Sequence, residues 1–328
     1  MPNPSQWAAA RARQVLQRAI RGHLESLGYL EVETPLLVPA PGMEPHIRAF
    51  EVPFVPETGV GMPRTLYLHT SPEYAMKRLL ADGSGPVFQI CKVFRNGEVS
   101  PTHNPEFTML ELYRPDADYR AIMADLESTL AAAAAALGRS EIFGLLPYER
   151  LTVREALQRE TGIDLQRAGD VASLTEAARR VGVRTERGDG YDDVFFRIFL
   201  ERVEPRLGRD RPSFLIDYPA SMAALARLSP DDPSVAERFE LYAHGLELAN
   251  GFSELTDADE QRRRLEDERA FRVARGRPAY PLDEPVLEAL RRMSPSGGVA
   301  LGLDRVLMLL LGAERIEEVL LFPAHAFV

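Results

Sequence analysis

A run of charged and aromatic side chains between residues 94 and 113 could bind an anionic ligand. Arg95 and Glu98 stand near its start, and Glu111 and Tyr113 stand near its end. Apolar residues flank the run on both sides, which is typical of two strands joined by a polar loop. Because side chains two residues apart on a strand share a face, Glu111 and Tyr113 could contact the same ligand. The pattern predicts a β-hairpin that carries binding groups.

Two arginines are the candidate phosphate-binding residues. The sequence has no Walker A pattern and no Gly-x-Gly-x-x-Gly after a strand, so the common glycine-rich phosphate loops are absent. Arg95 follows a predicted strand, and Arg305 opens a predicted helix, whose N-terminal amides favour anions. Taken singly, each arginine is more readily explained as one half of a structural salt bridge.

Two glutamates near residue 250 could hold a metal ion. Glu247 and Glu254 are seven residues apart, which places them on opposite faces of an unbroken strand. A bulge at Asn250-Gly251 would return them to a common face, where both carboxylates could bind Mg²⁺ against phosphates. An ordinary hairpin turn with two exposed glutamates explains the same spacing, and the spacing alone does not choose between them.

Several elements are expected to position the hairpin. Those before it are a helix over 5–27, a strand over 29–35, loops with short strands over 38–64, a strand over 66–69 and a helix from about 72 to 80. Ser71 is the expected N-cap of this last helix, and Pro72 its first helical residue. Those after it are a helix over 118–137, helices opened by capping boxes at Thr152 and Ser173, strands over 213–217 and 238–243, and a charged helix over 257–275.

The C-terminal part is expected to be a strand from Gly297 and a helix capped by Asp304 and ended by Gly312. Strands at both ends of the chain with helices between them predict one α+β domain over residues 1–328, built around an antiparallel sheet. Residues 114–210 are expected to be a mainly helical insertion without obvious chemistry.

The composition narrows the possible functions. The chain of 328 residues is 45% hydrophobic and 27% charged, and its net charge of −10 disfavours a broad nucleic-acid surface. Cys91 is the only cysteine, so no disulfide can form within the chain, which fits a reducing compartment. No signal-peptide pattern and no apolar run of roughly 20 residues occurs, so we expect a cytoplasmic protein that does not span a membrane.

Several stretches resemble motifs of the class II aminoacyl-tRNA synthetases, in particular the lysyl branch. Residues 28–35 resemble motif 1, residues 94–113 resemble motif 2, residues 302–305 resemble motif 3, and residues 70–73 and 247–255 also match lysyl-tRNA synthetases. The resemblance covers nearly the whole chain. It implies a catalytic core of antiparallel sheet flanked by helices, and a homodimer formed through motif 1.

The resemblance also narrows the branch. Lysyl-tRNA synthetases carry an N-terminal OB-fold that binds the anticodon, and we expect no such domain because the helix before motif 1 begins near residue 5. In this the chain is similar to the truncated paralogues that ligate (R)-β-lysine to elongation factor P. The family reaction implies that (R)-β-lysine, or lysine, is activated with ATP as an adenylate and passed to a lysine side chain of elongation factor P, without tRNA.

The same resemblance implies a set of site residues. Arg95 and Arg305 would be catalytic, Phe107 would stack on adenine, and Mg²⁺ would bind Glu247 and Glu254. The residues implied for ATP are Arg95, Asn96, His103, Asn104, Phe107, Glu247, Leu248, Gly302 and Arg305. Those implied for the amino acid are Ser71, Pro72, Glu73, Glu111, Tyr113, Glu254 and Ala300.

The chain departs from the family pattern at two positions, and two alternative functions remain open. The family motif has glutamate at the position of Gly97, and here the carboxylate is displaced to Glu98. Ala300 stands where lysyl-tRNA synthetases have glycine, which is consistent with a different lysine isomer. The alternatives are an amino-acid-activating enzyme with another acceptor, and a synthetase-like module without catalysis.

Overall fold

The computed structural model describes residues 2–44, 46–57 and 61–326, and its centre is a large sheet. The strand order is β1-β5-β6-β11-β10-β9-β8-β7. The strands are β1 (Leu30–Glu31), β5 (Val87–Phe94), β6 (Glu106–Pro115), β11 (Ser296–Gly302), β10 (Leu246–Ser253), β9 (Val235–Ala243), β8 (Ser213–Pro219) and β7 (Glu149–Thr152). Only the outer pairs β1–β5 and β7–β8 are parallel. The predicted α+β fold around an antiparallel sheet is therefore confirmed.

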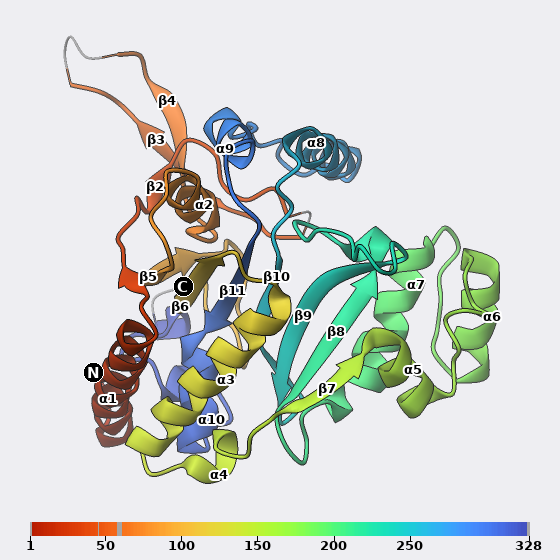
Figure 1. Cartoon of the computed structure of the whole chain (residues 1–328), viewed down its shortest axis with the longest axis horizontal. Coiled ribbons are helices and arrows are strands. Elements are labelled where there is room, and N and C mark those ends of the chain that lie inside the picture. Colours follow the sequence, from red (N-terminus) through yellow and green to blue (C-terminus); the bar gives the residue numbers. More distant parts are fainter. Residues whose placement is uncertain (1, 45, 58–60, 327–328) are drawn as a thin grey trace.

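Three helices cover one face of this sheet. They are α1 (Pro4–Ser26), α3 (Tyr119–Ala136) and α10 (Leu303–Leu311), and Figure 1 shows them together below the central strands. On α1, Leu16, Ile20 and Leu24 recur every four residues, so one stripe of the helix is buried. They belong to the same core as Leu110 of β6 and Leu301 of β11, whose side chains point to this face.

The opposite face of the same strands is covered differently. Helices α2 (Glu73–Ala81), α8 (Ala258–Ala274) and α9 (Glu284–Leu290) lie above it, beside a small sheet of β2 (Leu37–Val38), β4 (Arg64–Leu68) and β3 (Phe50–Phe54). Strands β3 and β4 extend away from the body (Figure 1). Of the expected loop region 38–64, residues 45 and 58–60 lie outside the described residues. This more open arrangement leaves room for a cavity against the sheet.

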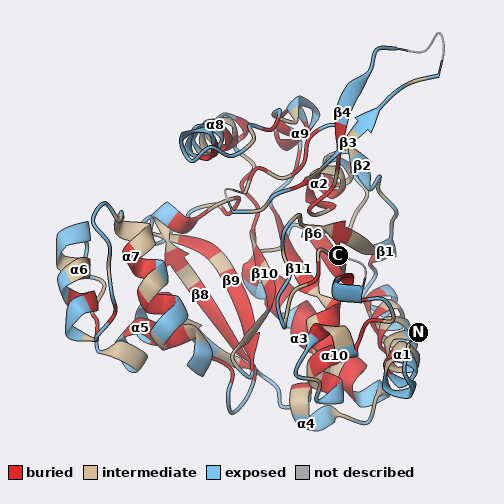
Figure 2. Ribbon diagram, turned by 180° about the vertical axis from the view of Figure 1, so that it is seen from behind, coloured by how far each residue is buried: buried red, intermediate tan, exposed pale blue. Residues whose placement is uncertain are grey.

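The stretch after β6 contributes a second layer around β7, β8 and β9. Its helices are α4 (Ser140–Phe143), α5 (Val153–Thr161), α6 (Val171–Arg180), α7 (Tyr191–Ile198), η1 (Phe199–Val203) and η2 (Glu204–Arg206). Helices α5, α6, α7 and η1 bury their own apolar cluster against β8 and β9, which are largely buried in Figure 2, whereas Phe143 of α4 belongs to the main core. The remaining short helices are η3 (Ala220–Met222), η4 (Ile316–Glu318) and η5 (Ala324–Ala326).

Four local expectations were wrong, and neighbouring groups explain three of them. The strand over 29–35 is only Leu30–Glu31, because just these residues pair with β5. Helix α2 begins at Glu73, although Ser71 Oγ does accept a hydrogen bond from Glu73 N at 2.9 Å. Helix α6 begins at Val171, because the Asp170 side chain accepts from the first free amides instead of Ser173.

The fourth error concerns the last helix. Asp304 does not cap α10, which begins at Leu303; the carboxylate instead accepts from Thr108 N at 2.7 Å and pairs with Arg13 at 2.5 Å. The capping box at Thr152 and the C-terminal Gly312, at φ +68°, are confirmed. Within the described parts of the chain, no helix has the length and apolar character required to cross a bilayer.

Candidate functional site

A cavity of about 280 Å³ lies on the open face of β6, β11 and β10. Most side chains expected at the site line it, namely Ser71, Glu73, Arg95, His103, Asn104, Phe107, Glu111, Tyr113, Glu247, Leu248, Glu254, Ala300, Gly302 and Arg305. Asn96 and Pro72 do not line it. The alternating residues 107, 109, 111 and 113 of β6 face the cavity, as the period of a strand requires.

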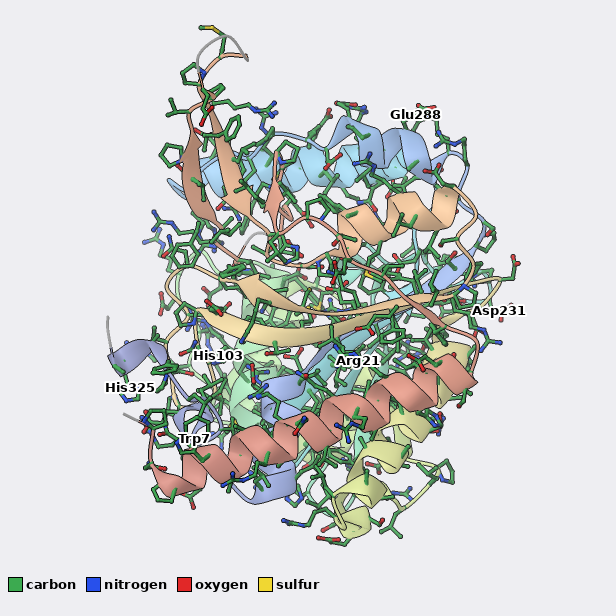
Figure 3. The ribbon with its side chains drawn as sticks, turned by 90° about the vertical axis from the view of Figure 1, so that its left-hand side faces the viewer. Trp7, Arg21, His103, Asp231, Glu288 and His325 are labelled. Carbon is green, nitrogen blue, oxygen red and sulfur yellow. The ribbon has the colours of Figure 1, made fainter. Side chains whose placement is uncertain are left out.

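One end of the cavity holds the two arginines. The Arg95 guanidinium lies 5.1 Å from the centre of the Phe107 ring, and so stacks on the face expected for adenine. Arg305 donates to the carbonyls of Glu247 (2.7 Å) and Thr102 (3.3 Å) and lies 2.6 Å from His103 Nε2. His103 belongs to the loop between β5 and β6, and Figure 3 shows it at the end of the sheet.

The state of His103 follows from these contacts. Burial, followed by the charges of Arg305 and Arg95, lowers the pKa of His103 to about 4. The ring is therefore neutral at pH 7 and its Nε2 accepts from Arg305. The proton then lies on Nδ1, which is 2.7 Å from Ser100 Oγ. His103 holds the Arg305 side chain in place in this structure.

The displaced carboxylate of motif 2 also reaches the site. Gly97 has φ +90°, a left-handed conformation that favours glycine, and the turn brings Glu98 Oε1 to 3.8 Å from Arg95. Glu98 lines the cavity. The neighbouring Asn96 uses its backbone amide to donate to Arg48 O at 2.7 Å. A one-residue shift in sequence therefore keeps a carboxylate beside the arginine.

The other end of the cavity is acidic. Glu111 accepts from Ser71 Oγ at 2.5 Å and from the Tyr113 hydroxyl at 2.8 Å. Burial, and then the charge of Glu73, raises the pKa of Glu111 to about 8 despite these hydrogen bonds. Burial likewise raises the pKa of Glu254 to about 8, with Lys77 opposing the rise and Glu73 adding to it. These carboxyls lack enough positive charge within the protein.

Lys77 is a buried cation that the sequence reasoning missed. Its ammonium lies 2.5 Å from Glu73 and 2.6 Å from Glu254. Burial lowers the pKa of Lys77, but these two carboxylates outweigh it and the pKa is raised overall. One lysine in a short helix gives no sequence signal for such a role; only its four-residue spacing from Glu73 is visible.

Strand β11 lets the acidic groups approach closely because its residues are small. Ala300 pairs with Glu111 on one side and Asn250 on the other. A Cβ atom at Gly298 would lie 2.3 Å from the Tyr113 ring and 2.6 Å from Glu254 Oε1. Glycine is therefore required at position 298.

The bulge expected in β10 exists, but it lies elsewhere. The register with β9 shifts between Glu247 and Ala249, whereas Asn250 and Gly251 continue the strand. The alternative of a hairpin turn at these two residues is thereby excluded. The extra residue in the bulge places Glu247 on the same face as Glu254, and both line the cavity.

Glu247 and Glu254 differ in how well they fit a role as ligands of Mg²⁺. Burial and then the charge of Glu240 raise the pKa of Glu247 to about 7, with nearby arginines opposing the rise, so a cation beside Glu247 would be stabilising. Glu254 is engaged by Lys77. The described residues contain no cluster of three or more acidic, histidine or cysteine ligands. Mg²⁺ commonly binds through one or two carboxylates plus phosphates, so Glu247 fits this role better than Glu254.

Comparison with known proteins places these features in a family. Residues 1–326 match the family model described as tRNA synthetases class II (D, K and N). The chain is 45% identical to an elongation factor P–(R)-β-lysine ligase of Salmonella arizonae over 94% of this chain and 93% of that protein. It is also 45% identical to the proteins of the same name from Klebsiella pneumoniae subsp. pneumoniae, with the same coverage, and from Pectobacterium atrosepticum, over 95% and 94% of the two chains.

Proposed function

Because the chain belongs to the class II tRNA synthetases of the D, K and N group, and within it to the elongation factor P–(R)-β-lysine ligases, we propose that it activates (R)-β-lysine with ATP and transfers it to a lysine of elongation factor P. One observation carries the proposal for the site. A single cavity has arginines at one end and buried carboxyls at the other. This arrangement suits a reaction between a triphosphate and an amino acid with two ammonium groups.

In the first step the carboxylate of β-lysine attacks the α-phosphate of ATP, which forms the P–O bond of an acyl-adenylate and releases pyrophosphate. Arg95 binds the α-phosphate and stabilises the negative charge that develops on it. Asn104, which donates to Glu106 O at 2.6 Å, holds the returning strand of the loop. No residue forms a covalent bond, since alignment and charge stabilisation are sufficient for this chemistry.

ATP binding requires the arginine end to rearrange. Adenine would take the place of the Arg95 guanidinium over Phe107, and Arg305 would leave His103 to cover the other face of adenine and reach the γ-phosphate. His103 and the backbone of Leu248 and Gly302 would contact the nucleotide, whereas Asn96, also expected there, lies outside the cavity. ATP binding therefore breaks the contacts of Arg95 with Phe107 and of Arg305 with His103. Charge-assisted hydrogen bonds from these arginines to the phosphates, which are stronger, take their place.

Mg²⁺ would be held by Glu247 together with phosphate oxygens, where it would neutralise charge on the phosphates. Glu254, the other carboxylate expected to bind metal, is better suited to the ammonium groups because it lies at the acidic end, where burial and the charges of Glu73 and Glu111 raise its pKa. Glu111, Tyr113 and Ser71 would bind the ammonium group farther from the carboxylate of the substrate, with Ala300 shaping the pocket.

In the second step the amine of the acceptor lysine attacks the activated carbonyl and AMP leaves. We propose that the enzyme acts as a homodimer in the cytoplasm, where the translation factor is found. Sedimentation at micromolar concentration tests the dimer, and a monomer would contradict it.

The proposed reaction is tested by mass spectrometry of elongation factor P after incubation with this protein, ATP and each lysine isomer. We expect a mass increase of one lysyl group, largest with (R)-β-lysine, and ATP–pyrophosphate exchange that depends on the same amino acid. Efficient charging of tRNA-Lys without modification of elongation factor P would contradict the proposal. If no amino acid supports ATP–pyrophosphate exchange, the protein would be a module without catalysis.

A further inference from the structure

The loop between β2 and β3 places one more carboxylate in the cavity. Glu44 lines the cavity together with Ser71 and Glu73, although it lies far from the recognised motifs in sequence. Its Oε2 atom is buried and has no hydrogen-bond partner among the described residues. A buried carboxylate oxygen without a partner is costly, so this position points to a cationic group that comes from outside the chain.

The position of this carboxylate is fixed by its own loop. The Glu44 side chain folds back over Gly42, where a Cβ atom would lie 2.2 Å from Oε2 and 3.0 Å from Thr70 Oγ1. Any residue other than glycine at position 42 would therefore displace the carboxylate. Thr70 Oγ1 is itself buried without a hydrogen-bond partner in the described part of the chain.

The loop is held rigidly, but the cation that holds it does not neutralise Glu44. Arg272 of α8 is buried and stacks on Tyr280, with its guanidinium carbon 4.2 Å from the ring centre. Its hydrogen bonds go to the carbonyls of Glu44 and Ile47, both at 2.8 Å, and of Pro278 at 3.0 Å. These donors thus bind backbone oxygens, and among the residues that the structure describes no cation forms a hydrogen bond with the Glu44 carboxylate.

The charged neighbours place Glu44 between the two ends of the cavity. Burial and then Glu73 raise the pKa of Glu44, while Arg95 and Arg272 lower it. The loop that carries Glu44 also accepts a hydrogen bond from Asn96 N through Arg48 O at 2.7 Å, so it borders the end of β5 beside Arg95, on the side where the reacting carboxylate would be.

We infer that Glu44 binds the ammonium group nearer the reacting carboxylate of the amino acid, so that it is a specificity-determining residue for the position of that amine. The inference rests on the proposed function. In β-lysine this amine is on C3 and in lysine on C2. A fixed carboxylate on a clamped loop can distinguish these positions, because a charge-assisted hydrogen bond requires a donor at a defined place.

The test compares the wild type with Glu44→Gln, which keeps the shape of the side chain and removes its charge. We expect the KM for (R)-β-lysine in ATP–pyrophosphate exchange to rise about 10- to 100-fold, from the loss of one charged hydrogen bond. The KM for ATP should stay within about twofold, because Glu44 is not part of the nucleotide end. An unchanged KM for (R)-β-lysine would overturn the inference.

Ligands that each lack one amine separate a direct contact from a general effect of charge. The inhibition constant of 6-aminohexanoate, which lacks the nearer ammonium, should be the same for both proteins, whereas that of 3-aminohexanoate should rise in the variant. An equal rise in the inhibition constants of both compounds, or a rise confined to 6-aminohexanoate, would overturn the inference.

Two further variants guard against misfolding and long-range charge effects. Gly42→Ala should reproduce the loss of β-lysine affinity, because the added methyl group occupies the place of the carboxylate. Glu268→Gln is the matched control: the charges of Glu44 and Glu268 interact, yet Glu268 does not line the cavity. A selective loss of β-lysine affinity in Glu268→Gln would overturn the inference. If the wild type itself shows no exchange with β-lysine, the proposed function fails, whereas an active wild type with an unaffected variant refutes only the role of Glu44.

Discussion

The two ends of the cavity differ in how far the protein itself satisfies their charged groups. At the nucleotide end, Arg305 already binds two carbonyls and His103, and Arg95 stacks on Phe107. At the amino-acid end, an oxygen of Glu44 is buried without a hydrogen bond to any described residue, and the pKa of Glu111 is raised to about 8. The nucleotide must therefore displace internal contacts, while a diamine supplies charge that the protein lacks.

The largest effect on stability is expected from Lys77, the buried cation that pairs with carboxylates of the acidic end. Lys77→Met removes the partner of Glu73 and Glu254 and leaves two buried carboxylates close together. We expect the free energy of unfolding at pH 7 to fall by about 3–5 kcal/mol, measured by urea denaturation. Because protonation of the carboxyls relieves this penalty, the loss should shrink at pH 5. A loss that does not depend on pH would contradict the assigned charge balance.

The largest effect on catalysis is expected at the nucleotide end. Arg305→Ala should lower kcat of ATP–pyrophosphate exchange about 100- to 1000-fold, because one preorganised cation at the phosphates is lost. The KM for β-lysine should change little, since Arg305 contacts only groups of the nucleotide end. His103→Gln is a useful companion: it frees Arg305 without removing it, so kcat should remain much closer to that of the wild type.

The affinity for β-lysine should rise with pH. Glu111 has its pKa raised to about 8 by burial and by Glu73, and it must be ionised to bind an ammonium group. Below pH 8 binding must release a proton, so the dissociation constant should fall by up to about tenfold per pH unit between pH 6 and 8. Calorimetry over this range measures the slope, and Glu111→Gln should flatten it. The same slope in that variant would assign the proton to another carboxyl.

The smallest expected effect comes from a single hydroxyl group. Tyr113→Phe removes one donor to Glu111, at 2.8 Å, and leaves the ring in place above Gly298. A hydrogen bond of this kind contributes about 1 kcal/mol, so we expect the KM for β-lysine to change about fivefold and the KM for ATP to stay unchanged. A change in both constants would show that the two ends of the cavity are not independent.

The sequence predicted the parts of the site that depend on local periodicity. The hairpin from Arg95 to Tyr113 was predicted because alternation along a strand sets which side chains share a face. The resemblance to synthetase motifs then connected it with Arg305 and with the strand that carries Glu247. The α+β fold followed in the same way from the order of helices and strands.

The missed features depend on contacts between distant segments. Glu44 lies in a proline-rich stretch without periodicity, and its position follows from Arg272, more than 200 residues away. Lys77 looks like a solvated lysine until Glu254 is placed beside it. Asp304 has the sequence of a helix cap, yet it binds Thr108 and Arg13 because those groups come to it from other elements. Propensities of single segments carry no record of such partners.

The bulge in β10 has a consequence for changes in chain length. Glu247 and Glu254 reach one cavity only because Leu248 is an extra residue in the register with β9. Deleting that residue would remove no charged group, although it would remove one buried leucine of the core. It would leave Glu247 and Glu254 six residues apart, an even spacing that keeps both on one face of a regular strand without a bulge. Sequences of this family that are one residue shorter between 247 and 254 would therefore be expected to have a regular strand here and to keep both carboxylates in the cavity.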